Sequence, residues 1–178
     1  MDMLEAYKAA HGDIFEISIG SGSLIVELLH NGKAVNRHEP MHPLFVSMPM
    51  SHADGTSALG YVGVKKEASV NAVMPYSVYK DGEVIFRIPS TGTFDTIYNA
   101  KIFTDVTGHW AGEYIDFVSA RGLFSGTGNN LFSPDITMTR AMFVQALANI
   151  EGINLTAYTA ASRFNDVAAN IWYAPGTG

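Results

Sequence analysis

The spacing of apolar residues changes near residue 100, from alternation with polar residues to a helical period. In the first hundred residues, short runs such as 13–19 alternate polar and apolar positions, which is the pattern of half-buried strands. We predict strands over residues 13–19, 24–29, 44–49, 61–66, 72–79, 84–88 and 91–98. Pro49 is expected to end its strand or to place it on a sheet edge, because proline donates no ladder hydrogen bond.

Turn signals separate these runs. Residues 20–23 alternate glycine and serine, residues 31–32 are Asn-Gly, and residues 80–83 contain Asp-Gly. A short amphipathic helix is predicted over residues 4–10, with Gly12 as its stop. The first hundred residues are therefore predicted to form a small, mostly antiparallel β domain with one helix at its start.

Beyond Thr107 the apolar residues recur at helical spacing. Trp110, Tyr114 and Phe117 fit one helix, for which Thr107 is the expected N-cap and Gly122 lies just past the end. Residues 123–134, rich in glycine, asparagine and serine, are predicted to form a loop.

A second helix is expected over residues 139–150. Its N-cap would be Thr139 and its stop Gly152. We expect Phe143, Leu147 and Ile150 to share its buried face.

The opening of this helical part returns near the C-terminus. Residues 103–106 read Phe-Thr-Asp-Val, and residues 164–167 read Phe-Asn-Asp-Val. A motif that restarts indicates a repeat. The predicted fold class is thus α+β, with a β-rich domain at 1–100, a helix-loop-helix repeat at 101–157, and a linker with a truncated second repeat at 158–178.

Composition narrows the possible functions. The net charge of −6 and the pI of about 5.4 argue against a nucleic-acid-binding protein, which would carry clustered cations. The chain has no cysteine, so disulfides, thiolate metal ligands and a thiol nucleophile are excluded. No apolar run reaches the roughly 18 residues of a membrane span. We find no catalytic triad or distinctive carboxylate pair, so we expect no enzymatic activity and no cofactor.

The pattern of four histidines does not favour a metal site. His38 and His42 have helical spacing, but Pro40 and Pro43 disfavour a helix there, and His30 and His52 add no known metal motif. We therefore expect surface histidines and no metal. Residues 1–8 lack the pattern of a signal peptide. We expect any export signal to lie upstream of a fragment whose end interrupts a repeat.

The helical part resembles the S-layer homology (SLH) repeat. The family pattern combines Phe-x-Asp-Val, His-Trp-Ala, a glycine-rich loop ending in Phe-x-Pro, and Thr-Arg-Ala at the second helix. The matching residues are Phe103, Asp105, Val106, His109, Trp110, Ala111, Gly122, Gly126, Phe132, Pro134, Thr139, Arg140 and Ala141. The resemblance covers one full repeat and the start of another, where the family usually has three.

The resemblance implies a secreted, cell-surface protein of Gram-positive bacteria. It implies non-covalent anchoring to the wall by binding a pyruvylated secondary cell-wall polysaccharide. The alternative is a structural module, a homo-oligomer whose repeats are completed by other chains. Where the family often has glutamate after Thr-Arg-Ala, this chain has Met142, which removes a reciprocal capping contact.

Five residues are predicted to bind ligand. Arg140, beside Thr139 at a helix N-terminus, is suited to a pyruvyl carboxylate, although a structural bond to Asp105 or Asp135 is the alternative. Trp110 can stack on a sugar, but we favour a place in the core between the helices. Asp105 is expected chiefly to order the loop before the first helix through Asx-type bonds. Gly126, like Gly128, is expected to adopt positive φ, which would also let the backbone approach a ligand.

Overall fold

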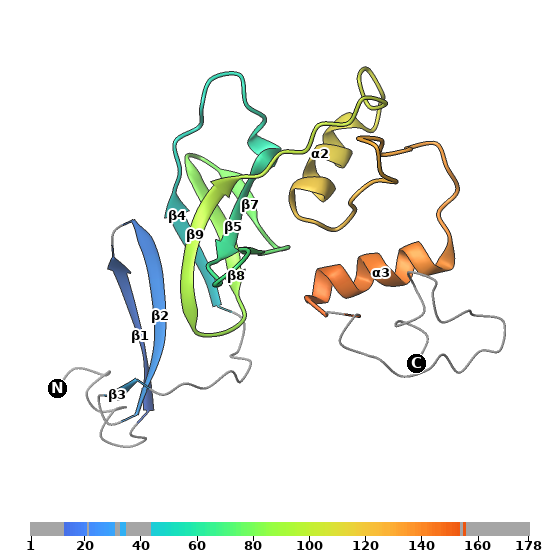
Figure 1. The fold of residues 1–178 in the computed structure, drawn as a ribbon. Coiled ribbons are helices and arrows are strands. Elements are labelled where there is room, and N and C mark those ends of the chain that lie inside the picture. The colour runs from blue at the N-terminus through green and yellow to red at the C-terminus, as the bar shows by residue number, and fades with distance from the viewer. Residues whose placement is uncertain (1–12, 21, 31–32, 35–43, 154, 156–178) are drawn as a thin grey trace, which may run out of the picture. The chain divides into compact units, whose positions relative to one another are not determined.

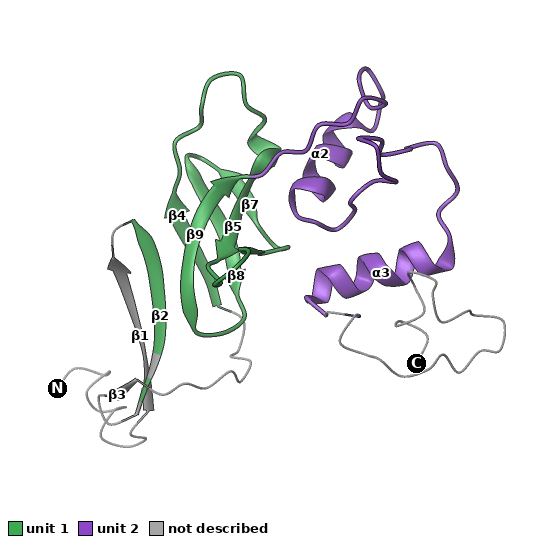
Figure 2. Ribbon diagram, in the orientation of Figure 1, with its two compact units in different colours: residues 1–98 green, residues 99–178 purple. Residues whose placement is uncertain are grey.

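The computed structural model describes residues 13–20, 22–30, 33–34, 44–153 and 155. The chain divides into two compact units, Met1–Tyr98 and Asn99–Gly178 (Figure 2). Within the described residues, the first unit contains strands and one 3-10 turn, and the second contains two α-helices, which confirms the α+β class (Figure 1). The predicted helix at 4–10 and the restarting repeat at 158–178 lie outside the described residues.

A six-stranded antiparallel sheet forms one layer of the first unit. Its strands run in the order β1 (Asp13–Gly20), β2 (Ser23–His30), β9 (Gly92–Tyr98), β5 (Tyr61–Lys65) and β6 (Ala72–Val73), and β3 (Lys33–Ala34) pairs with β2. Gly20 pairs with Ser23 across a tight turn in which Gly22 has φ +82°. The predicted turn at 20–23 is therefore confirmed.

The second sheet has three antiparallel strands, in the order β4 (Leu44–Pro49), β8 (Glu83–Ile88) and β7 (Val78–Lys80). The turn from β7 to β8 has positive φ at Asp81 (53°) and Gly82 (84°), as the favoured two-residue hairpin turn requires. Strand β4 lies on the edge and ends at Pro49, so the prediction for this proline is confirmed.

The single strand predicted over 72–79 is wrong. These residues form β6 in one sheet and β7 in the other, separated by a turn. Pro75 interrupts the ladder because it has no backbone N–H. The buried Ser77 holds the turn, since its hydroxyl donates to the Met74 carbonyl over 2.6 Å and accepts from the Gly63 N–H over 2.9 Å.

Side chains from both sheets share one core. Its buried residues are Leu24, Val26, Met48, Tyr61, Met74, Val84, Phe86, Ile88 and Phe94. Gly63 of β5 permits the closest contact, because a Cβ built at this glycine would lie only 2.4 Å from Cγ of Phe86. A glycine in the middle of a buried strand is thus explained by the ring that occupies the space of its missing side chain.

In the second unit, α2 (Gly112–Ala120) starts later than predicted. Its N-cap is Ala111, which makes no side-chain capping bond, and Thr107 is not the cap. Gly108 has φ +74°, a left-handed conformation that cannot be part of the helix. The chain therefore turns before α2 begins. Gly122 follows the helix at φ +68°, as predicted.

Helix α3 (Arg140–Glu151) has the predicted ends but a different buried face. The Thr139 hydroxyl accepts from the Met142 N–H over 3.2 Å, and Gly152 closes the helix at φ +67°. Ala146 and Ala148 are buried, whereas the expected core residues Phe143 and Leu147 are about half exposed. Ile150, the third residue of the expected face, is partly buried.

We expect Gly63→Ala to lower the free energy of unfolding by about 1–3 kcal/mol, because the added methyl group must displace the Phe86 ring from a packed core. Urea unfolding measures this change. Gly112→Ala is the matched control, since a Cβ there would meet its nearest atom, in Val106, at 3.8 Å and alanine favours the helix. Equal stability of both variants would contradict the close packing at Gly63.

Candidate functional site

The segment entering α2 presents aromatic rings to solvent. Trp110 is 83% exposed and Tyr114 is 69% exposed. Their ring centres lie 6.4 Å apart, and Trp110 lies 5.6 Å from the ring of His109. The expectation that Trp110 belongs to the core is therefore wrong. Because the helix starts only at Gly112, Ile115 rather than Trp110 supplies its buried apolar position.

His109 connects this segment to the approach to α3. Its Nδ1 accepts the Ala111 N–H over 3.1 Å, and its Nε2 lies 3.4 Å from an Asp135 carboxylate oxygen. The ring thereby fixes the backbone on which Trp110 stands. His109 was only part of a motif in the sequence, and its linking role follows from the fold.

Asp105 ties the start of the unit to the far end of its loop. The N–H groups of Phe132 and Ser133 donate to its two carboxylate oxygens over 2.9 and 2.7 Å. The bond from Phe132 is the main reason that the pKa of the Asp105 carboxyl lies below its ordinary value of 3.8. Burial raises this pKa, and the bond from Ser133 lowers it further. Asp105 does bond to backbone, but across 27 residues rather than through a local Asx turn.

Gly126 allows the loop to fold back on itself. It has φ +76°, and a Cβ at this position would lie 2.4 Å from the Leu131 carbonyl oxygen and 3.0 Å from the Phe103 ring. Phe103 in turn packs against Phe132, with ring centres 5.3 Å apart. The positive φ predicted for Gly126, and for Gly128 at 102°, is confirmed.

Arg140 is the first residue of α3, next to the capping Thr139. Among the residues that the structure describes, the ion pairs are Lys66–Asp95, Lys80–Asp81 and His109–Asp135. Arg140 belongs to none of them. Asp105 and Asp135, its proposed structural partners, contact other groups instead. The guanidinium thus stands exposed at the positive end of a helix.

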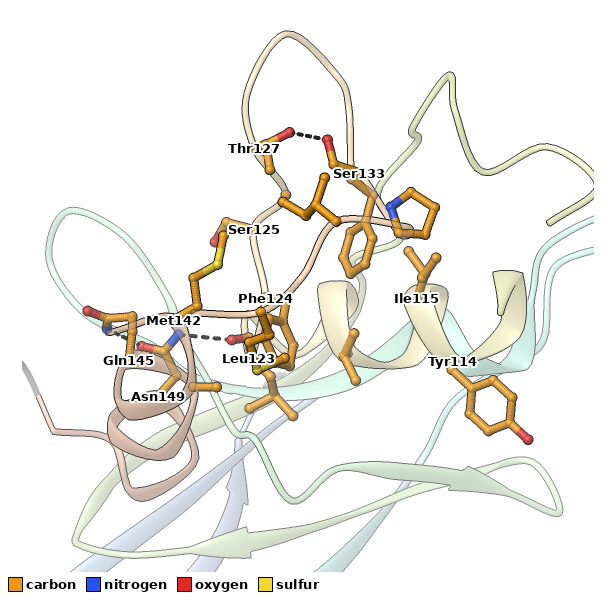
Figure 3. Close-up of a pocket in the computed structure, with 17 residues that line it drawn as sticks. Tyr114, Ile115, Leu123, Phe124, Ser125, Thr127, Ser133, Met142, Gln145 and Asn149 are labelled. Atoms are coloured by element: carbon orange, nitrogen blue, oxygen red, sulfur yellow. Dashed lines mark hydrogen bonds between the residues drawn. The ribbon is translucent and has the colours of Figure 1, made fainter. Parts of the chain in front are cut away.

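An open, largely apolar cavity of about 650 Å³ lies between α2, the loop and α3 (Figure 3). Its apolar lining includes Ile115, Phe124 and Met142. Its polar residues Gln145 and Asn149 bond to each other over 2.8 Å, and Asn149 also donates to the Leu123 carbonyl over 3.1 Å. These polar groups are thus partly satisfied within the unit.

The structure does not gather the five predicted residues around this cavity. Gly126 lines it, whereas Trp110, Asp105, Thr139 and Arg140 are not among its lining residues. Helix α3 turns Met142, Gln145, Ala146 and Asn149 toward the cavity instead of the larger residues favoured by the sequence. Their i, i+3, i+4, i+7 spacing was the available signal, but the competing stripe of bulkier side chains outweighed it.

Arg121 is a buried cation that the sequence did not single out. It follows α2 directly and is only 3% exposed. Its Nη1 donates to the Phe117 carbonyl over 2.9 Å, and its guanidinium carbon lies 3.6 Å from the centre of the Phe117 ring. Burial lowers the pKa of Arg121 to about 10, so the group stays charged at neutral pH. Its surroundings make it a structural residue at the helix end.

The described histidines and helices provide neither a metal site nor a membrane span. Within the described ranges, no three histidine or acidic residues come together in a way that could hold a metal ion. His52 bonds to the Thr56 carbonyl and packs beside Tyr61, whereas His38 and His42 are not described. None of the described helices is long and apolar enough to cross a bilayer.

The match to a protein family lies within the second unit. Residues 102–142 match the family model described as the S-layer homology domain. The chain is also similar to an amylopullulanase from Thermoanaerobacterium thermosulfurigenes, with 26% identity over 119 residues. The aligned part is 67% of this chain and 6% of that relative, so the chain spans a small fraction of the relative's length. No solved structure matches the chain.

We expect Asp105→Asn to destabilise the second unit near neutral pH, because an amide oxygen replaces the carboxylate that accepts two backbone N–H groups. Since the pKa of Asp105 is lowered on folding, its stabilising contribution is present above about pH 4 and is lost as pH falls through the folded pKa. Melting temperatures of both proteins between pH 3 and 7 should therefore converge at low pH. Asp54→Asn, at an exposed turn, is the control. A difference independent of pH would contradict this role of the carboxylate.

Proposed function

We propose, from the match of residues 102–142 to the S-layer homology domain, that the chain anchors a bacterial surface protein by binding an acidic polysaccharide of the cell wall. A domain of this family associates its protein with the cell surface or wall and acts as a binding module. The finer proposal is that the ligand is a pyruvylated secondary cell-wall polysaccharide. The amylopullulanase activity named for the relative stays with that relative, because so little of it is aligned.

The exposed guanidinium of Arg140 is the observation that carries this proposal. It has no ion-pair partner in the described part of the chain and lies at the N-terminus of α3, where the helix dipole favours an anion. A guanidinium can bind a carboxylate through two parallel hydrogen bonds. A pyruvyl ketal places a carboxylate on a sugar, so this ligand supplies the matching group.

The exposed aromatic rings support a sugar ligand. Trp110 and Tyr114 present apolar ring surface to solvent, although burying such surface would be favourable. A pyranose ring has one apolar face that can cover an indole. In this proposal Trp110 binds the sugar ring and Arg140 binds its carboxylate. Thr139 caps α3, and Asp105 and Gly126 hold the loop that lies between Trp110 and Arg140 in the sequence.

The carboxylate-binding role of Arg140 predicts a loss of affinity without a loss of fold. Arg140→Ala should weaken binding to wall preparations that carry the pyruvylated polymer by about tenfold or more, as expected when a charged hydrogen-bonded pair is lost. Its melting temperature should stay that of the natural chain, because Arg140 is exposed. Cosedimentation at several protein concentrations measures the affinity.

Lys101→Ala is the matched control, since Lys101 is an exposed cation of the same unit. Wall preparations stripped of the polymer provide the second control. Equal retention on intact and stripped walls would exclude the polymer as ligand. Unchanged affinity of Arg140→Ala alone would remove this residue from the site and leave the polymer in place.

A second candidate function is structural assembly through the repeat. It is supported by the apolar side chains that α3 leaves about half exposed, Phe143, Val144 and Leu147, and by the open cavity beside this helix. A unit that leaves such surface exposed is suited to packing against copies of itself.

For this alternative, light scattering of the full chain should show oligomers whose mass falls to that of a monomer in the variant with Phe143→Ser and Leu147→Ser. Both substitutions remove exposed apolar surface and leave the buried Ala146 and Ala148 in place. A natural chain that is monomeric at high concentration would exclude assembly through α3.

A further inference from the structure

The outer face of the three-stranded sheet in the first unit combines exposed apolar side chains with charged ones. Strand β8 alternates strictly, with Val84, Phe86 and Ile88 fully buried and the residues between them turned outward. Beside them, Phe45 is 61% exposed and Val78 is 48% exposed. Burying these two side chains against another protein surface would be favourable.

The strand register arranges this face in three rows. Phe45 pairs with Arg87, Ser47 pairs with Ile85, and Pro49 pairs with Glu83. On the other side of β8, Val78 pairs with Ile85 and Lys80 pairs with Glu83. The middle row is thus centred on Ile85. Along β8, the cation Arg87 lies two residues to one side of Ile85 and the anion Glu83 two residues to the other.

The two charges are not paired within the described chain. Neither Arg87 nor Glu83 takes part in an ion pair there. Arg87 lies over the ring of Tyr76, 5.4 Å from its centre, and its buried Nε has no hydrogen-bond partner among the residues that the structure describes. Glu83 accepts a hydrogen bond from the Ser47 hydroxyl. Each charge therefore remains able to pair with an opposite charge from outside.

We propose that this face, formed by β4, β8 and β7, is a homodimer contact that pairs it with the same face of a second copy. The two-fold axis passes beside Ile85, parallel to the sheet and perpendicular to its strands. It stacks the two sheets face to face with their strands aligned, about 10 Å apart as packed sheets are. This operation places Arg87 opposite Glu83 of the other copy, twice. Val78 then meets its own counterpart, and Phe45 meets Pro49.

The size of the face limits the area that this contact can bury. Three strands of up to six residues cover about 14 by 20 Å. The total area buried by two copies stays below the roughly 1,200 Å² of a standard interface. The dimer is therefore weak and forms at high local concentration. It lies in the first unit and does not rest on the proposed wall anchoring.

Charge reversal tests the pairing directly. Sedimentation velocity of the full chain between about 10 and 500 µM should show a reversible dimer that weakens as salt rises. Arg87→Glu and Glu83→Arg should each weaken dimerisation at least tenfold, because like charges then face each other. An equimolar mixture of the two variants should form a heterodimer within about threefold of the natural affinity, since both cross-pairs are again opposite in charge.

Two further variants complete the test. Ile85→Lys places like charges at the axis, so it should abolish the dimer and no mixture should restore it. Lys101→Glu reverses a charge in the second unit and should leave the dimer unchanged. Circular dichroism checks that each variant is folded, and a heterodimer in the mixture itself requires folded chains.

The proposal is overturned if the natural chain stays monomeric at 500 µM, or if the mixture of the two charge variants remains monomeric. Dimers that persist in both single variants but disappear with Phe143→Ser and Leu147→Ser would place the contact on α3 instead. Failure of wall binding would leave this outcome untouched, because no wall polymer enters the measurement.

Discussion

The second unit depends on one carboxylate. Asp105 accepts hydrogen bonds from two backbone N–H groups, 27 and 28 residues further along the chain, and so fixes the glycine- and asparagine-rich loop between the helices. The Phe103–Phe132 ring contact and the close approach at Gly126 lie beside this bond. With the loop held, α2 and α3 can be set apart around an open cavity and still belong to one unit.

The two units are stabilised in different ways. The first buries a core shared between two sheets, in which the missing side chain of Gly63 accommodates Phe86. The second leaves much of its aromatic and aliphatic surface in solvent. It relies on hydrogen bonds that backbone N–H groups donate to the side chains of Asp105, His109 and Thr139. A small unit built in this way keeps surface available for a ligand or a neighbouring copy.

The two proposals are compatible physically. A single carboxylate contact at Arg140 and a small sheet contact are each weak, but surface proteins act side by side at high local concentration. Under that condition, weak contacts made at the same time add their free energies and hold a protein far more firmly than either alone.

Much of the local structure was determined by the sequence alone. The turns at Gly22 and Gly82, the cap at Thr139 and the helix ends at Gly122 and Gly152 are confirmed, because each depends on the conformational freedom or hydrogen-bonding capacity of residues close in the chain. The edge position of β4 followed in the same way from Pro49.

The tertiary structure decided which faces are buried. Residues 72–79 are divided between two sheets, although their pattern predicted one strand. Trp110 is exposed and α3 buries Ala146 and Ala148, although periodicity favoured Trp110, Phe143 and Leu147 as core residues. Periodicity shows which residues share a face, but which of two apolar faces is covered depends on long-range contacts such as those of Asp105 and His109. These contacts join residues 26 to 28 positions apart, and no local pattern in the sequence encodes them.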